Sequence, residues 1–198
     1  MGIKWQTKTN KLPKMYKTIQ SIDSKTVKVG ALTGDHAWLA GIHEYGADIK
    51  AKNVQYLTVP VCSEAAGKKA SAFSDLFVYT SKKGNKMLAR NENGSLKFYY
   101  WLTPSVKIPE RAFLRKGHDE NINRIIKQTE RALGQVVVGK MDIDTLLDLY
   151  GQQMSSAIKE YMKTTQPNSP ITIENKGSST PLVGKTNGLI ESITWKKE

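Results

Sequence analysis

The sequence has a single cysteine and no long apolar run. Cys62 alone cannot form an intrachain disulfide, and its isolation excludes zinc or iron–sulfur sites that need several cysteines. No apolar run approaches the roughly 20 residues of a membrane-spanning helix, and the N-terminus lacks the apolar core of a signal peptide. These absences predict a soluble protein that is made inside the cell, in a reducing compartment.

The composition predicts one folded domain with an unevenly basic surface. Of 198 residues, 39% are apolar and 24% are charged, which is enough to bury a proper core within a single domain, 1–198. The net charge is +12, of which residues 1–34 carry +6 and residues 63–118 carry +7. Residues 119–198 carry no net charge. The basic surface therefore belongs to the first three fifths of the chain.

Apolar spacing locates the expected helices and strands. Steps of three and four residues predict amphipathic helices, and alternating or β-branched runs predict strands. The expected helices cover about 12–23, 35–45, 122–137 and 143–162, with Asp35 and Asp119 as N-caps. The expected strands cover 26–32, 54–61, 76–80, 86–90, 96–103 and 190–195, and residues 62–75 form a loop or a broken helix.

Together these elements predict an α+β fold: an antiparallel sheet packed against a helical hairpin, with a β insertion at about 63–103 and a long C-terminal loop. In the insertion, apolar residues alternate on both sides over 98–101, which is typical of a strand buried on both faces. Gly151 interrupts the second helix of the hairpin. It indicates either close packing against a neighbouring element or a tolerated surface glycine.

Two motifs that begin like catalytic or cofactor sites are incomplete. His43-Glu44 starts like a zinc-protease helix, but Ala47 stands where the second histidine is required. Gly184-Lys185-Thr186 matches the end of a phosphate-binding loop, but Ser179 stands where its first glycine is required. We therefore expect no metal and no cofactor, and an enzyme using His43 and Glu44 is the least favoured of the functions considered.

The basic half of the chain favours a second hypothesis, a nucleic-acid-binding protein without catalytic activity. Its sequence contains no recognition helix, RNP motif or zinc finger that would read a base sequence, so binding would be nonspecific. A solvated basic face is the simpler explanation of the same charge. The lysines concerned lie near an exposed helix and along a hairpin: Lys11, Lys14, Lys17, Lys82, Lys83 and Lys86.

Three segments carry a pattern of their own. They are Ile42-His43-Glu44-Tyr45-Gly46 after a strand and a short helix, Ile108-Pro109-Glu110-Arg111-Ala112-Phe113-Leu114-Arg115, and Lys176-Gly177-Ser178-Ser179-Thr180-Pro181-Leu182-Val183 before Leu189, Ser192 and Ile193. In order and spacing they resemble the neck and tail-completion (virion morphogenesis) family of long-tailed bacteriophages. The resemblance covers residues 26–62 and 104–195. Its motif positions here are His43, Glu44, Gly46, Pro109, Arg111, Phe113, Lys176, Gly177, Ser178, Pro181, Leu182 and Val183.

The resemblance implies a structural protein of the virion and not an enzyme. Subunits of this family join a ring at the head–tail junction or at the head-proximal end of the tail. The implied partners are further copies of the chain, as a hexamer or dodecamer, and neighbouring connector, neck and tail proteins. DNA would pass through the lumen without sequence-specific contacts, and the lysines named above would face it. Assembly would take place in the host cytoplasm, away from membranes.

The polar segment 171–187 is the expected assembly loop. Its composition leaves little apolar surface to offset the entropy lost on ordering the backbone, so a partner would supply the missing contacts. Leu182 and Val183 are the expected apolar anchors for that partner. The alternative is that both residues pack on the subunit's own sheet.

Overall fold

The computed structural model describes residues 11–165, 167–168, 173, 177–183 and 186–198, and it has the predicted α+β fold. Its helices are α1 (Leu12–Asp23), α2 (Gly34–Tyr45), α3 (Phe113–Asp119), α4 (Ile122–Val137), α5 (Ile143–Thr164) and α7 (Gly188–Glu191). Its strands are β1 (Val27–Ala31), β2 (Ala47–Lys50), β3 (Leu57–Pro60), β4 (Phe77–Thr80), β5 (Lys86–Glu92), β6 (Ser95–Thr103), β7 (Ser105–Ile108) and β8 (Ile193–Lys197).

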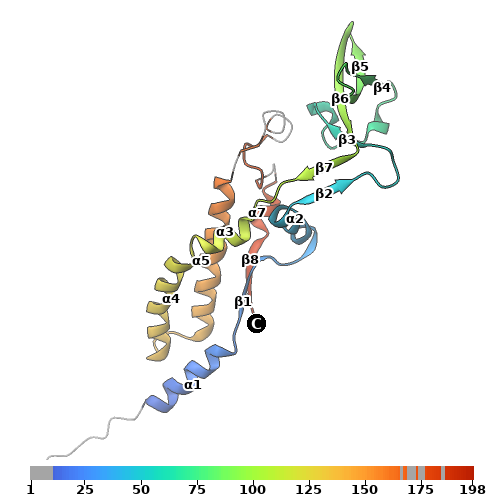
Figure 1. The fold of residues 1–198 in the computed structure, drawn as a ribbon. Helices are drawn as coiled ribbons and strands as arrows, with labels where there is room; N and C mark the ends of the chain where they lie inside the picture. Colours follow the sequence, from blue (N-terminus) through green and yellow to red (C-terminus); the bar gives the residue numbers. More distant parts are fainter. Residues whose placement is uncertain (1–10, 166, 169–172, 174–176, 184–185) are drawn as a thin grey trace, which may run out of the picture.

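The molecule is elongated and has a helical body with a β arm at one end (Figure 1). The arm, residues 47–108, begins as the antiparallel pair β2 and β7 and ends in a four-stranded antiparallel sheet, the tip sheet, in the order β3-β6-β5-β4. Helix α1 lies at the opposite end of the molecule (Figure 1). The tip sheet includes β3, which precedes the expected insertion boundary at residue 63.

The body contains the predicted helical hairpin, α4 and α5, joined at Gly139. The antiparallel pair β1 and β8 packs on α5, so a two-stranded ladder and the hairpin share one core. Among the described residues, no helix combines the length and the apolar composition that a membrane span requires. The largest fully buried side chains of this core come from five elements or segments: Phe113, Ile125, Met154, Met162, Leu182 and Ile193.

Helix α5 begins with a capping interaction that makes stability depend on pH. The Asp142 carboxylate accepts hydrogen bonds from the Thr145 N–H at 2.8 Å and the Thr145 hydroxyl at 2.6 Å. The Thr145 side chain, followed by its backbone N–H, holds the pKa of Asp142 below its ordinary value of 3.8. Because the folded-state pKa is the lower one, the cap is fully effective above the unfolded-state pKa and is lost as pH falls through the folded-state pKa.

We therefore expect Asp142→Ala to lower the melting temperature by a constant amount from neutral pH down to about pH 5. Below about pH 4 the difference from wild type should shrink, because the wild-type carboxyl becomes protonated and loses its advantage. Circular-dichroism melts of both proteins across this range measure it. A difference that persists unchanged at the lowest pH would show that the cap does not depend on the charge.

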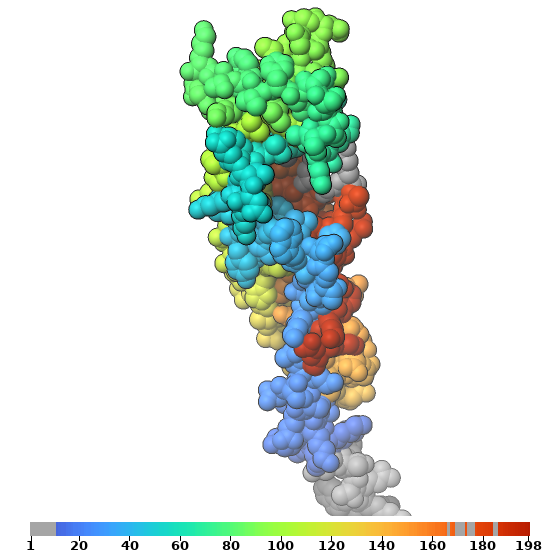
Figure 2. All heavy atoms as spheres, turned by 90° about the vertical axis from the view of Figure 1, so that its right-hand side faces the viewer, coloured from blue at the N-terminus to red at the C-terminus, as the bar shows by residue number. Residues whose placement is uncertain are grey.

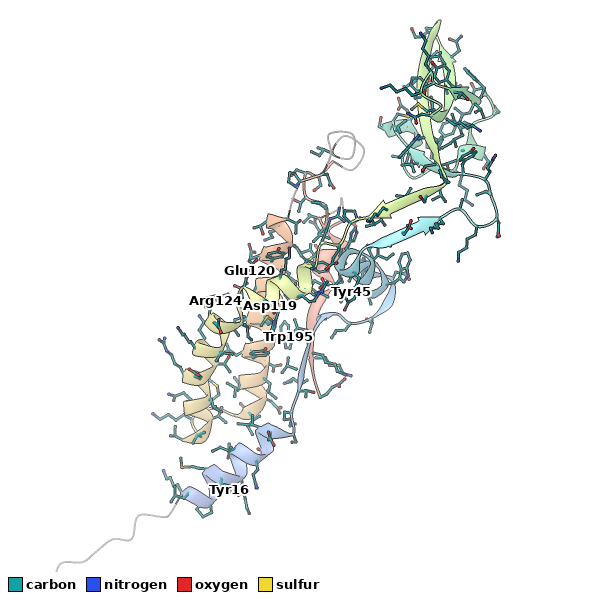
Figure 3. All side chains as sticks on the ribbon, viewed as in Figure 1. Tyr16, Tyr45, Asp119, Glu120, Arg124 and Trp195 are labelled. Atoms are coloured by element: carbon teal, nitrogen blue, oxygen red, sulfur yellow. The ribbon has the colours of Figure 1, made fainter. Side chains whose placement is uncertain are left out.

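Gly151 is required by a close approach between α5 and β8. A Cβ at this position would overlap the ring of Trp195, which extends from β8 toward α5 (Figure 3). The Trp195 Nε1–H donates to Asp148 Oδ1 at 3.3 Å, and Lys197 donates to the other oxygen of Asp148 at 2.8 Å. Of the two explanations offered for this glycine, close packing against a neighbouring element is confirmed.

The tip sheet departs from simple alternation because of a β-bulge in β6. Leu88 is opposite Tyr100 and Ala89 is opposite Phe98, so Tyr99 is an extra residue. Tyr99 and Tyr100 therefore both pack against Phe73, at 5.0 and 6.2 Å between ring centroids. The predicted pairing of Phe98 with Tyr100 on one face, and of Tyr99 with Trp101 on the other, is wrong.

Several short elements were not predicted, and both predicted caps are wrong. Asp35 is the second residue of α2, whose N-cap is Thr33. Asp119 does not cap α4: it is the last residue of α3 and pairs with His118 at 2.8 Å, while Asn121 is the N-cap of α4. Helix α3 has only seven residues, and three of the four residues of β2 are exposed, so neither shows a clear hydrophobic period. The expected final strand begins later, at Ile193, because α7 occupies Gly188–Glu191.

Candidate assembly site at the base of the arm

The base of the arm is organised by one buried carboxylate. Glu44, in the last turn of α2, has 2% of its surface exposed. Its side chain accepts hydrogen bonds from the backbone N–H of Leu114 at 2.8 Å and of Arg115 at 3.2 Å. The first N–H groups of a helix have no partner within that helix. Glu44 therefore caps α3 from a separate helix, and its charge complements the positive helix end.

Arg115 completes the charge balance of this carboxylate. Its Nε donates to Glu44 Oε1 at 2.8 Å, and its Nη2 donates to Glu110 at 2.6 Å and to the Glu44 carbonyl at 3.2 Å. Hydrogen bonds to Glu44, and then to Glu110, raise the pKa of the guanidinium above its ordinary value. The group also lies 5.1 Å from the centre of the Tyr45 ring (Figure 3). We call Glu44, Arg115 and Glu110 the Glu44 junction.

The backbone around the junction is equally constrained. Gly46 ends α2 with φ +74°, and a Cβ there would lie 2.9 Å from both Glu110 N and Ile108 O. Glycine is therefore needed both for the conformation and for the close passage of the returning strand. Ala112, which precedes α3, has φ +47° and donates its N–H to the Glu44 carbonyl at 3.2 Å. The last turn of α2 is thus bonded directly to the start of α3.

His43 and Arg111 form a second contact between the same two segments. The Arg111 N–H donates to the His43 carbonyl at 2.9 Å, and its Nη1 lies 3.0 Å from His43 Nδ1. Burial lowers the pKa of Arg111 below its ordinary value. Pro109 is exposed, and its carbonyl accepts a longer hydrogen bond, of 3.5 Å, from the same guanidinium. His43, Glu44, Gly46 and Arg111 therefore meet at one place in the fold.

The third motif segment reaches the same region through the core. Phe113, with no exposed surface, lies in one cluster with Leu182, Leu189 and Ile193. Leu182 is 2% exposed, and Val183 packs against this cluster from its edge. The expectation that Leu182 and Val183 await a partner is wrong for the described subunit, and the self-packing alternative is confirmed. Their apolar side chains gain more from the core beside Phe113 than from exposure to water.

The polar part of that segment is held locally. The Ser178 hydroxyl accepts from the Thr180 N–H at 3.2 Å, and the side-chain amide of Asn168 donates to the Ser178 carbonyl at 3.1 Å. Gly177 is exposed with φ +70°, and Pro181 is buried. Lys176 lies outside the described residues. Ser178 is therefore bonded within its own turn.

The two groups of candidate DNA-facing lysines are not brought together. Figure 2 shows α1 and the tip sheet at opposite ends of the molecule. On α1, the lysines at 11, 14 and 17 are exposed, as are those at 82 and 83 in the β4–β5 turn. Lys86 is half-buried, donates to the Tyr56 hydroxyl at 3.0 Å and lies 5.0 Å from the centre of that ring. A single subunit thus presents two separate basic groups.

The hydrogen bonds at the base of the arm connect the end of α2 to the start of α3. Both carboxylate oxygens of Glu44 accept hydrogen bonds, one from the Leu114 N–H and the other from Arg115, so the Glu44 side chain joins α2 to α3. Within the described ranges, no three His, Cys, Asp or Glu side chains are grouped to hold a metal ion. Arg115 stands in the motif segment, but its role was not predicted, because its carboxylate partner lies 71 residues earlier in the sequence.

Comparisons of the chain with models of protein families, with curated proteins and with solved structures found no match. A function for this chain is therefore proposed from its own residues and geometry.

Proposed function

We propose that this chain is a structural protein of a bacteriophage virion, which assembles as a ring at the head–tail interface or at the head-proximal end of the tail. The ring would act as a neck, tail-completion or tail-terminator component. One observation supports this role most: the motif segments around Glu44, Arg111 and Leu182 converge where the arm joins the body. A ring requires each subunit to hold two interfaces at a fixed relative orientation. The Glu44 junction supports this role because it fixes the base of the arm to the body.

The proposed role requires neither catalysis nor a metal or cofactor. Its partners are further copies of the chain, in a hexamer or dodecamer, together with neighbouring connector, neck and tail proteins. The protein would be assembled in the host cytoplasm and would remain in the virion. DNA would pass through the lumen, and contacts to it would be nonspecific.

The separate lysine groups fit a ring better than a single DNA-binding surface. In one copy the described lysines of α1 and of the β4–β5 turn are at opposite ends, so these two groups do not form one patch. Around a ring axis, each group would instead repeat as a circle of positive charge. If nonspecific nucleic-acid binding were the main function, the isolated subunit would bind duplex DNA with an affinity that falls steeply with salt.

We expect the purified protein to form closed rings, alone or on adding phage tails or connectors. Light scattering after size exclusion should give a mass six or twelve times that of the 22.1-kDa chain, and negative-stain images should show rings or capped tail ends. The control is the same preparation imaged with an unrelated basic protein of similar size. A chain that stays monomeric with tails and with connectors, yet binds DNA tightly at low salt, would contradict the proposal.

A further inference from the structure

One face of the tip sheet is apolar and exposed. Strand register places Phe77 on the same side as Phe98, and Met87 on the same side as Trp101. The Tyr79 and Phe98 rings, 5.4 Å apart, lie on this side as well. None of the described strand residues on this side carries a charge. We call this surface the open face; its apolar members are Val59, Phe77, Tyr79, Met87, Leu96, Phe98 and Trp101.

The other side of the same sheet is covered by the chain itself around Tyr99 and Tyr100. Residues 62–76 pass over it, and Ala65, Tyr99 and Tyr100 form a buried cluster there. On the open face, by contrast, Phe77 is 45% exposed, Leu96 49% and Trp101 43%. The open face has no such cover among the described residues, so its apolar side chains remain in contact with solvent.

Helix α1 carries the complementary surface. Met15, Tyr16 and Ile19 lie on one side at helical spacing, and α1 has no buried residue. Tyr16 is 64% exposed and Ile19 is 53% exposed, and Tyr16 projects from α1 at the end of the molecule remote from the arm (Figure 3). Ile22, at the C-terminal end of α1, packs against the body.

We propose that α1 of one copy packs on the open face of a second copy. In this way, α1 of one copy supplies the layer that the open face of its neighbour lacks. Within one subunit the two surfaces lie at opposite ends of an elongated molecule, so they can meet only between copies (Figure 1). Their dimensions agree, because a helix of 12 residues is about 18 Å long and four strands about 4.8 Å apart form a sheet of similar width.

The charges also favour a second copy as the occupant. Two chains of net charge +12 repel one another, so they associate best through surfaces without charge. The open face meets that condition among its described strand residues. On α1, Lys14 lies on the side opposite Tyr16, and Lys17 lies on the side opposite Ile19. The uncharged open face offers no partner for a basic surface. Packing of the apolar side of α1 on it leaves Lys14 and Lys17 in solvent.

A contact between two different surfaces has a defined consequence for assembly. It is heterologous, because each copy donates α1 and receives α1 at different surfaces, so it produces a closed ring when the rotation between copies closes and a filament when it does not. This inference names the two surfaces through which copies would join. Only the expectation that they close into a ring rests on the proposed function.

The test uses one variant for each surface, with matched controls. Tyr16→Lys disrupts the α1 side, and Ser21→Lys places the same charge on the opposite side of α1. Phe77→Lys disrupts the open face, and Val78→Lys places the same charge on the next residue of β4, which points to the other face and is 59% exposed. Circular-dichroism melts establish that each variant is folded, and sedimentation velocity measures its mass.

We expect both controls to form the wild-type oligomer, and Tyr16→Lys and Phe77→Lys each to be monomeric, with association at least tenfold weaker. When these two monomers are mixed, one intact α1 meets one intact open face, so a one-to-one dimer should form and grow no further. A mixture that remains monomeric, a variant that still forms the full oligomer, or a monomeric wild type would overturn the inference.

The result is separable from the phage role, because no phage component is present in the mixture. If copies join through these surfaces but bind neither tails nor connectors, the inference stands and the proposed function is wrong. If rings cap tails and are unaffected by Tyr16→Lys and Phe77→Lys, the proposed function stands and the inference is wrong.

Discussion

Replacing Glu44 with glutamine should lower the free energy of unfolding by about 3 kcal/mol, because it leaves backbone donors and a guanidinium facing an uncharged amide. The native carboxylate is nearly fully buried and accepts from the N–H groups of Leu114 and Arg115 and from the Arg115 side chain. For a chain of 198 residues, a loss of this size lowers the melting temperature by roughly 6–12 °C. Thermal and urea melts at neutral pH measure both quantities.

Glu110→Gln is the matched control for this change. Glu110 pairs with the same arginine at 2.6 Å but is 54% exposed, so solvent screens the pair and its loss should have little effect. Equal destabilisation by the two substitutions would show that the contribution of Glu44 to stability does not come from capping α3. In that case the base of the arm would be held by its backbone hydrogen bonds.

Gly151→Ala should destabilise the body by about 2–3 kcal/mol, although alanine is the better helix former. The added methyl group would overlap the Trp195 ring, which is fixed between α5 and β8 by its hydrogen bond to Asp148. The helix and the strand must move apart to admit it. Chemical denaturation monitored by circular dichroism and by the fluorescence of the chain's four tryptophans, Trp195 among them, measures the loss.

Two companion substitutions identify the cause. Gly134→Ala in α4 has no heavy atom within 4 Å of the added Cβ, so it should stabilise the protein by about 0.5–1 kcal/mol. In a Trp195→Ala background, Gly151→Ala should lose most of its cost, because the overlapping ring is gone. If the cost of Gly151→Ala were unchanged in that background, a contact other than the one with Trp195 would be responsible.

The elements predicted correctly are those whose pattern is local. The stripes from Ile122 to Val137 and from Ile143 to Met162 record the burial of one helix side over several turns, and α4 and α5 follow them. Helix α3 is too short to show such a period. It also begins after a left-handed alanine and takes its cap from a distant residue, so no local signal marks its start.

The candidate site was predicted as a set of residues but not as a mechanism. The sequence identified His43 and Glu44 as the start of a zinc-protease motif, and it excluded that motif because Ala47 stands in place of the second histidine. It could not show that Glu44 is bonded to Leu114, 70 residues later, because that contact exists only after the arm has folded back. Likewise, an extra residue at Tyr99 shifts the strand faces in a way that alternation alone cannot reveal.

The orientation of the arm relative to the body depends on the backbone at Gly46 and Ala112. Both residues have left-handed backbone conformations, and both lie where the two strands of the arm enter and leave the body. When the arm rotates about its base, the displacement of each atom grows with its distance from the base. A small change in backbone angle at either residue therefore moves the tip sheet much more than it moves the base. In a closed ring, the angle held at these two positions would therefore set the curvature, and with it the number of subunits that complete the circle.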